Sequence, residues 1–395
     1  MSIRTLLLLT ALAVPGATLA SDHAATPAAI AQPVPVPVQL GTAVAPIALL
    51  ADLSSGQVLY ARAADQRFLP ASMTKAMTAL IAFDLIAAGT LREDSLITVR
   101  PATAQRWAGK GTTLNLQGGE QVSVHDLLLG TTTVSANDAA VALAEGALGS
   151  VEAWTAAMNA RAAALGMVGS HFATPNGFPD HGRTYVTAND LVRLAGALID
   201  GHPALYRRYF GHPVMAWRGG MLRSHDPFAG LLAGADGIKT GHSYEAGFNF
   251  LGSVNRDGRR LVLVIGRAAT EPGRAATAKA LAEWGYGAWD SYAFLTPEFV
   301  VGAAKVQGGA ARSVPLGVPR GFALSQPTGA AAQVTGRILY DGPLKAPLAA
   351  GQQVARLELH LAGQPVHTIP LITTRAVAIA GPIDRIVNGL LGLLP

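Results

Sequence analysis

The chain has 395 residues, half of them hydrophobic, which is enough for one large core and a second, smaller one. Its net charge of +5 is mild and scattered, and the doublets Arg207-Arg208 and Arg259-Arg260 lack the aromatic interleaving of a nucleic-acid-binding surface. There is no cysteine, which excludes disulfides, thiolate nucleophiles and sulfur-ligated metals, and the ten histidines form no HExxH pair. We therefore expect no nucleic-acid partner, no metal site and no cofactor.

The N-terminal segment has the composition of an export signal. Residues 1–20 contain one arginine, an apolar stretch too short to span a bilayer comfortably, and the small residues Thr18 and Ala20 for cleavage. Residues 21–42 are rich in alanine and proline without a period, which predicts an extended linker. We expect an exported protein whose folded part begins near residue 43.

The next 250 residues or so mix strand and helix patterns. Two apolar runs flank Ser-Ser-Gly in "APIALLADLSSGQVLYARAAD" and predict a hairpin, and a buried helix carrying Lys75 follows. Helices are predicted within residues 120–170 and over 188–200, the latter with an asparagine cap. The runs "GIKTGH", "GFNFLGSV" and "RRLVLVIG" predict antiparallel strands before a last helix at roughly 272–289. We predict an α/β domain over residues 43–292, with helices against an antiparallel sheet.

The pattern changes from about residue 293. Short runs with Gly/Pro turns predict a small all-β domain over residues 293–376. Residues 377–395 return to helical spacing, and the apolar residues between 383 and 394 recur on one face. This tail is too short to span a bilayer, so it is predicted to lie on a membrane surface or, alternatively, to dock on the β domain.

The stretch "PASMTK" breaks a local rule. Ser72 could cap the helix, but Lys75 puts a cation in the first turn of a helix whose apolar residues point in most directions. A buried lysine is costly unless its charge is paired or its pKa falls. Such breaks are expected at functional sites.

Two further stretches form a set of motifs with Ser72 and Lys75. Ser135 and Asn137 stand at the head of an apolar helix in "VSANDAA", and Lys239-Thr240-Gly241 lies on a strand in "DGIKTGHS". Each alone is weak, but Ser-x-x-Lys, Ser-x-Asn and Lys-Thr-Gly in this order are a known signature of acyl-serine enzymes.

The chemistry explains the residue types. A lysine three residues after a serine shares its helix face, and burial lowers its pKa toward a neutral amine that can take the hydroxyl proton. Ser135 and Asn137 can complete a hydrogen-bond relay and hold a substrate amide, and Lys239 and Thr240 can hold a substrate carboxylate. Gly241 would let an extended peptide approach the strand edge. The backbone N–H groups of Ser72 and His242 are the expected oxyanion hole. Arg223 is a weaker candidate for the carboxylate pocket, the alternative being a solvated loop arginine.

The sequence resembles the low-molecular-mass penicillin-binding proteins, which are serine-type D-Ala-D-Ala carboxypeptidases (peptidase family S11). The blocks "SSGQVLYARAADQRFLPASMTKAMTA", "VSVHDLLLGTTTVSANDAA", "GSHFATPNGF" and "DGIKTGHSYEAGFNF" carry the resemblance, and the C-terminal region resembles that family's small β domain. The resemblance implies a penicillin-binding-protein/β-lactamase-like fold and location at the periplasmic face of the inner membrane. It also implies action on peptidoglycan stem peptides ending in D-Ala-D-Ala and acylation by β-lactam antibiotics.

By this resemblance Ser72 is the acylated nucleophile, Lys75 its base and Ser135 part of the second catalytic motif. The resemblance assigns substrate binding to Asn137, Lys239, Thr240, Gly241 and His242.

Three alternatives remain open. A D,D-endopeptidase acting on wall cross-links carries the same motifs, but usually lacks the β domain. A class A β-lactamase would need a Glu-x-x-x-Asn element between the second and third motifs, and Glu145 and Glu152 are followed four residues on by Gly149 and Ala156. A catalytically dead wall-binding homologue would usually have lost one of the motif residues, all of which are present.

Overall fold

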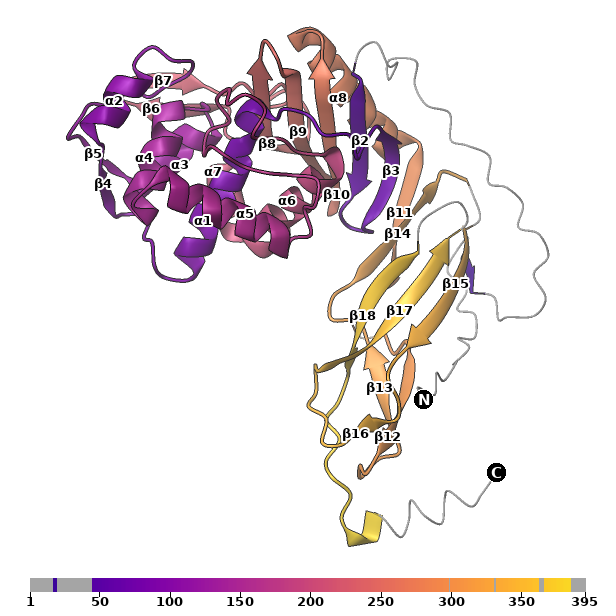
Figure 1. Cartoon of the computed structure of the whole chain (residues 1–395). Coiled ribbons are helices and arrows are strands. Elements are labelled where there is room, and N and C mark those ends of the chain that lie inside the picture. The colour runs from indigo at the N-terminus through magenta and orange to yellow at the C-terminus, as the bar shows by residue number, and fades with distance from the viewer. Residues whose placement is uncertain (1–16, 20–44, 298, 330–331, 362–365, 385–395) are drawn as a thin grey trace. The chain divides into compact units, whose positions relative to one another are not determined.

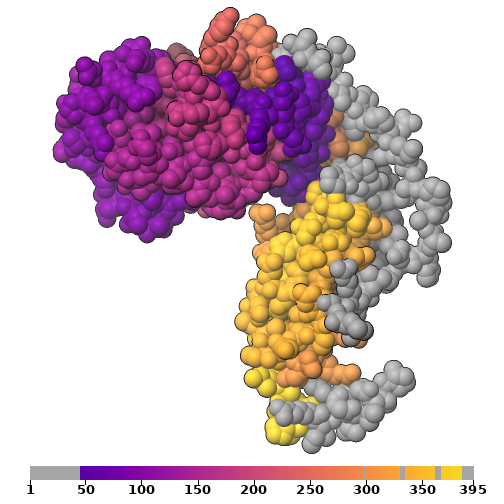
Figure 2. Space-filling model, in the orientation of Figure 1, coloured from indigo at the N-terminus to yellow at the C-terminus, as the bar shows by residue number. Residues whose placement is uncertain are grey.

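The computed structural model describes residues 17–19, 45–297, 299–329, 332–361 and 366–384. The chain divides into two compact units. The first, here called the α/β unit, comprises residues 36–53 and 57–286, and the second, the β unit, comprises residues 1–35, 54–56 and 287–395. The space-filling view shows the α/β unit as one compact body, coloured from indigo to orange (Figure 2).

A five-stranded antiparallel sheet is the centre of the α/β unit (Figure 1). Its order is β3-β2-β10-β9-β8, so an early hairpin and a late three-stranded meander meet in one sheet. This confirms the strand pairing predicted from the sequence, and it leaves β8 at an edge. The strands are β2 (Ile47–Asp52), β3 (Gln57–Arg62), β8 (Ala235–Ser243), β9 (Gly247–Arg256) and β10 (Arg259–Ala268).

Side chains alternate between the two faces of a strand, and both faces of this sheet are covered. Leu49 and Val262 belong to the large core that the helices of the unit share. On the opposite face, Leu50 and Leu261 lie beneath Gly285 of α8 (Glu271–Gly287), where a Cβ atom would come within 2.5 and 2.8 Å of their side chains. A glycine is therefore needed for α8 to pack this closely.

The remaining helices and short strands lie between the two hairpins in sequence. The helices are α1 (Thr74–Ala87), α2 (Pro101–Trp107), α3 (Val124–Thr132), α4 (Asn137–Leu148), α5 (Val151–Ala164), α6 (Ala188–Gly201) and α7 (Pro203–Tyr209). The short strand pairs are β4 (Leu96–Thr98) with β5 (Gln121–Ser123), and β6 (Val214–Trp217) with β7 (Gly220–Arg223).

One predicted cap is wrong. Helix α6 is capped by Thr187, whose hydroxyl accepts a hydrogen bond from the Asp190 N–H at 3.2 Å, and not by Asn189. The Asn189 amide donates instead to Asp65 at 2.6 Å. The Asn189 side chain therefore contacts a residue distant in sequence, whereas the local pattern predicts that it caps the helix.

The β unit is built from strands, as predicted. Its larger sheet has the order β1-β15-β17-β18-β13-β12-β16, and β11 pairs with β14 separately. The strands are β1 (Ala17–Leu19), β11 (Trp289–Leu295), β12 (Gly302–Gln307), β13 (Ser313–Gly317), β14 (Phe322–Pro327), β15 (Ala332–Leu339), β16 (Leu344–Lys345), β17 (Gln353–Leu361) and β18 (His367–Thr373). Val334, Ile338, Leu357, Leu359 and Leu371 form its core.

The predicted amphipathic tail falls largely outside the described residues, which end at Asp384. At its start, Leu348 and Val377 exchange two backbone hydrogen bonds of 2.9 Å. Among the helices of the described ranges, none has the length and apolar character needed to cross a bilayer.

Candidate active site

Ser72 lies in a 3₁₀ turn, Ala71–Met73, which leads directly into α1. The residue at the N-cap of α1 is Met73, and no side chain caps this helix, so the Ser72 hydroxyl is not used as a cap. It accepts a hydrogen bond of 2.8 Å from Nζ of Lys75. The structural interpretation of Ser72 as a helix cap is therefore wrong, and the serine–lysine contact predicted from their spacing is confirmed.

The Lys75 amine is fully buried and makes three hydrogen bonds of 2.8 Å. Its partners are Oγ of Ser72, Oδ1 of Asn137 and the backbone carbonyl of Asn176. Burial is the main cause that lowers its pKa well below the ordinary value, the charge of Lys239 lowers it further, and Asp138 opposes both. The amine therefore favours its neutral form far more than an exposed lysine does.

The direction of these hydrogen bonds decides what a neutral Lys75 can do. A neutral amine has two hydrogens and one lone pair. The Asn176 carbonyl only accepts, and Oδ1 of Asn137 faces the amine because Nδ2 of Asn137 donates to the Lys110 carbonyl at 3.0 Å. These two acceptors use both hydrogens, so the lone pair is left for the hydroxyl hydrogen of Ser72.

Ser135 and Asn137 flank the start of α4. Ser135 adopts a left-handed conformation, with φ at +67°, and lines the same cavity as Ser72. The N-cap of α4 is Ala136, with no side-chain hydrogen bond, so neither polar residue acts as the helix cap. The strained backbone at Ser135 is of the kind found at functional sites.

A loop over residues 108–120 forms one wall of the cavity through Gly111 and Thr112. Asp138 holds this loop in place, since its two carboxylate oxygens accept hydrogen bonds from the N–H groups of Leu114 and Leu116 at 2.9 and 3.0 Å. The side chain of Asn137 supports the loop as well, through the Lys110 carbonyl. Sequence reasoning missed Asp138, whose partners lie more than twenty residues away.

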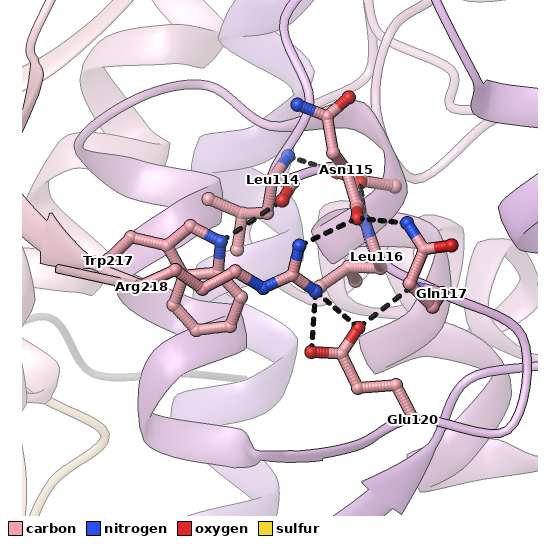
Figure 3. Close-up of polar contacts among 8 residues, drawn as sticks. Leu114, Asn115, Leu116, Gln117, Glu120, Trp217 and Arg218 are labelled. Carbon is pink, nitrogen blue, oxygen red and sulfur yellow. Dashed lines mark hydrogen bonds and ion pairs between the residues drawn. The ribbon is translucent and has the colours of Figure 1, made fainter. Parts of the chain in front are cut away.

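The β6–β7 hairpin fastens the same loop (Figure 3). Trp217 donates from its indole nitrogen to the Leu114 carbonyl at 3.0 Å. Arg218 donates to the Asn115 carbonyl at 3.0 Å and contacts both carboxylate oxygens of Glu120 at 2.6 Å. The loop is thus held on two sides by side chains from distant parts of the sequence.

Strand β8 forms the opposite wall with Thr240, Gly241 and His242. A Cβ atom on Gly241 would lie 2.1 Å from the Pro70 carbonyl oxygen and 3.1 Å from the Met73 nitrogen. Glycine is therefore required so that β8 can pack against the turn carrying Ser72, a reason that differs from the peptide approach inferred from the sequence. The His242 ring stacks on Phe248, with 4.0 Å between centroids.

Lys239 lies buried beside this wall and is not among the residues that line the cavity. Its Nζ donates to the Thr240 carbonyl at 3.2 Å. Burial lowers its pKa to about 7, the charge of Asp226 opposes this shift, and Arg274 adds to it. The charge of Lys239 is therefore sensitive to pH near neutrality.

Arg274 is a cavity residue that sequence reasoning missed. It is 3% exposed, donates to Glu271 at 3.0 Å, and its Nε has no partner among the described residues. Since α8 brings it to a cavity of about 400 Å³ shared with Ser72 and Thr240, it is a candidate anion ligand. The weaker sequence candidate, Arg223, is exposed on β7 and does not line this cavity.

Comparison with known proteins identifies the family of the chain. Residues 34–270 match the family described as D-alanyl-D-alanine carboxypeptidase, and residues 290–378 match the penicillin-binding protein 5 C-terminal domain. The chain belongs to the D-alanyl-D-alanine carboxypeptidase family. It is a serine-type carboxypeptidase with a penicillin-binding-protein fold, as the sequence predicts.

The similarity extends over both units. The chain is 32% identical over 347 residues to D-alanyl-D-alanine carboxypeptidase DacD of Salmonella typhimurium, covering 86% of this chain and 87% of that one. It is 31% identical over 353 residues to DacA of Escherichia coli K12, covering 86% and 85%. The structure of penicillin binding protein 5 from Haemophilus influenzae superposes with a TM-score of 0.75 at 29% identity, covering 85% and 98%.

The hairpin support of the loop gives a first prediction. Replacing Arg218 by alanine (Arg218→Ala) should loosen residues 113–120, because it removes the contacts to Glu120 and the Asn115 carbonyl. We expect kcat/KM for D-alanine release to fall about threefold to tenfold, and amide hydrogen exchange in this loop to accelerate.

Arg256→Ala is the matched control, since Arg256 makes a two-pronged ion pair with Glu283 away from the loop. Both variants should lose similar, small stability, on the order of 1 kcal/mol or less. Equal effects of the two substitutions on kcat/KM and loop exchange would contradict the positioning role of Arg218.

Proposed function

We propose that Ser72 is the acylated nucleophile of this carboxypeptidase and Lys75 its general base. The observation that carries the proposal is the 2.8 Å contact between Lys75 Nζ and Ser72 Oγ, with both amine hydrogens directed at Asn137 and Asn176. A serine needs an adjacent base to attack a carbonyl, and the buried amine, with its lowered pKa, is such a base.

The reaction is an acyl transfer in two halves. Oγ of Ser72 attacks the carbonyl of the penultimate D-alanine as Lys75 takes its proton, and the backbone N–H groups of Ser72 and His242 stabilise the oxyanion. The peptide C–N bond breaks, the proton passes through Ser135 to the leaving amine, and D-alanine departs. Water then adds to the ester, which restores Ser72 and releases the shortened peptide.

Substrate recognition divides between the two walls of the cavity. Asn137, beside the catalytic pair, would hold the amide of the acyl half. Thr240 and Arg274, with the charge of Lys239 behind them, would hold the terminal carboxylate. Gly241 and His242 complete this side of the cavity.

The proposed substrates are peptidoglycan stem peptides ending in D-Ala-D-Ala, and β-lactam antibiotics are the proposed covalent inhibitors. Support for β-lactam binding comes from penicillin-binding protein D2 of Listeria monocytogenes, which has been solved in ampicillin-bound and cefotaxime-bound forms. That protein is 29% identical to this chain, and its ampicillin-bound structure has a TM-score of 0.55.

Intact-mass spectrometry after penicillin treatment tests the nucleophile. The wild type should gain the mass of one penicillin, and Ser72→Ala should gain none. The same substitution should reduce D-alanine release from a D-Ala-D-Ala pentapeptide by about three orders of magnitude or more.

Lys75→Arg serves as the companion variant, because arginine keeps the positive charge but cannot accept the serine proton. It should also fail to acylate at a useful rate. A penicillin adduct that persists in Ser72→Ala would refute the assignment of the nucleophile.

Carboxylate recognition should depend on pH. Below about pH 7 Lys239 carries its proton and attracts the substrate carboxylate, and above its pKa of about 7 this charge is lost. We expect a peptide with a free terminal carboxylate to exceed its terminal amide in kcat/KM by on the order of tenfold to a hundredfold near pH 6. This ratio should fall as the pH rises to about 9.

In Lys239→Arg the ratio should stay constant over that range, because arginine remains charged. A wild-type ratio that does not change with pH would rule out titration of Lys239 as its cause. Equal cleavage of the free-acid peptide and its terminal amide at every pH would contradict recognition of the terminal carboxylate altogether.

We further propose that the enzyme is exported and held at the periplasmic face of the inner membrane by residues 383–394. The support is the export-type sequence of residues 1–20, the amphipathic spacing of the tail, and the exposed side chains of Ile379 and Ile383 where the described chain ends.

Deleting residues 381–395 should move the protein from the membrane fraction to the soluble fraction. Salt should release little of the intact protein, because Arg385 is the one basic residue of the tail and attachment would depend on apolar burial. Membrane sedimentation of the truncated protein, or a soluble intact protein, would exclude this anchor.

A further inference from the structure

A second cavity, of about 280 Å³, lies beside the catalytic one. It is bounded by α2, α4 and the loop over residues 174–183. Phe178 and Pro179 line both cavities, and Asn176, whose carbonyl accepts from Lys75, also lies in its wall. The two cavities are therefore neighbours across a few residues of one loop.

Part of the inner surface of this second cavity is apolar. Val141, Pro175 and the buried ring of Trp107 contribute to it, and Phe178 meets Trp107 edge to face with 5.1 Å between centroids. Such a lining can bury the methylene groups of a peptide side chain.

The charged groups at this cavity are unevenly paired. Glu145 accepts from the Thr103 hydroxyl at 2.6 Å and lies 3.9 Å from Arg100. Asp180 accepts from the backbone N–H and the hydroxyl of Thr184 at 3.1 and 2.6 Å. Both carboxylates at the cavity thus already have partners.

The two arginines of the cavity have no carboxylate partner among the described residues. Arg106 is exposed and lies over the Trp107 ring, 5.5 Å from its centroid, and Arg183 donates only to the Asp180 backbone carbonyl at 3.2 Å. Neither forms an ion pair with any described residue. A partly apolar hollow with two guanidinium groups that form no ion pair suits a ligand that carries a carboxylate on an aliphatic stem.

We propose that this cavity is a subsite for a carboxylate on the acyl half of the substrate, bound by Arg106 and Arg183. The inference rests on the proposed function, in which Thr240 and Arg274 take the terminal carboxylate and the acyl half lies past Asn137. In an acidic stem peptide this second carboxylate comes from one of two sources. It is either the α-carboxylate of a γ-linked D-glutamyl residue or the side-chain carboxylate of diaminopimelic acid.

Matched peptides separate these sources. The first pair is acetyl-γ-D-glutamyl-L-lysyl-D-alanyl-D-alanine and its D-isoglutaminyl analogue, which differ only in a carboxylate against a carboxamide. The third peptide replaces the lysine of the isoglutaminyl analogue by meso-diaminopimelic acid. D-Alanine release is measured for each with the full-length wild type, the double variant Arg106→Gln/Arg183→Gln, and the control Arg207→Gln. Arg207 is an exposed arginine of α7 that does not line the cavity.

One carboxylate-bearing peptide should exceed the neutral isoglutaminyl peptide in kcat/KM by about tenfold in the wild type and in Arg207→Gln. The advantage should fall to near unity in the double variant and shrink at high salt, because the arginines are exposed. The position of the effective carboxylate identifies its source. Formation of the penicillin adduct by each variant shows that the catalytic cavity is intact.

Equal cleavage of all three peptides by the wild type would overturn the subsite, as would an advantage that survives in the double variant. Either result leaves the proposed function standing, because D-alanine is still released. Failure to cleave any peptide, together with no penicillin adduct, would overturn the proposed function itself and this subsite with it.

Discussion

The buried amine of Lys75 is the constraint around which the α/β unit is arranged. A lysine without water must find hydrogen-bond partners and is pushed toward losing its proton, and here burial favours the neutral amine while three separate segments supply its partners. Ser72 comes from the turn before α1, Asn137 from the start of α4, and Asn176 from the loop over residues 174–183. Removing any one of these partners would leave a buried polar group unpaired, so the stability of the unit depends on the same contacts that the proposed reaction uses.

Two glycines allow these segments to come so close. A Cβ on Gly241 would overlap the Pro70 carbonyl, and a Cβ on Gly177 would lie 1.9 Å from the Ala71 carbonyl. The turn carrying Ser72 is thus enclosed by the backbones of β8 and of the loop at Gly177. Gly177 also has a φ of +70°, which L side chains rarely adopt. Both positions should therefore resist substitution even though neither supplies a reacting group.

Sequence could predict what depends on local spacing. The three-residue step from Ser72 to Lys75 and the antiparallel run of β8 to β10 follow from periodicity and turn residues. Tertiary contacts could not be read this way. The Asn176 partner is a backbone carbonyl, which any residue possesses, and Arg274 reaches the cavity only because α8 packs across the sheet. The hydrogen bonds from Trp217 and Arg218 to the loop over residues 108–120 join residues about a hundred positions apart and have no local sequence signal.

The relative size of the effects that lower the Lys75 pKa matters for the proposed reaction. If the charge of Lys239 were the main reason for its lowered pKa, a substrate carboxylate bound nearby would neutralise that charge and weaken the base when it is needed. Burial is instead the largest cause, and the charge of Lys239 is second. A substrate that fills the cavity also removes the water beside the Ser72–Lys75 pair, which opposes the loss of the Lys239 effect. In the proposed reaction an anion can therefore bind beside Lys75 without protonating it, because burial is the largest cause of its lowered pKa.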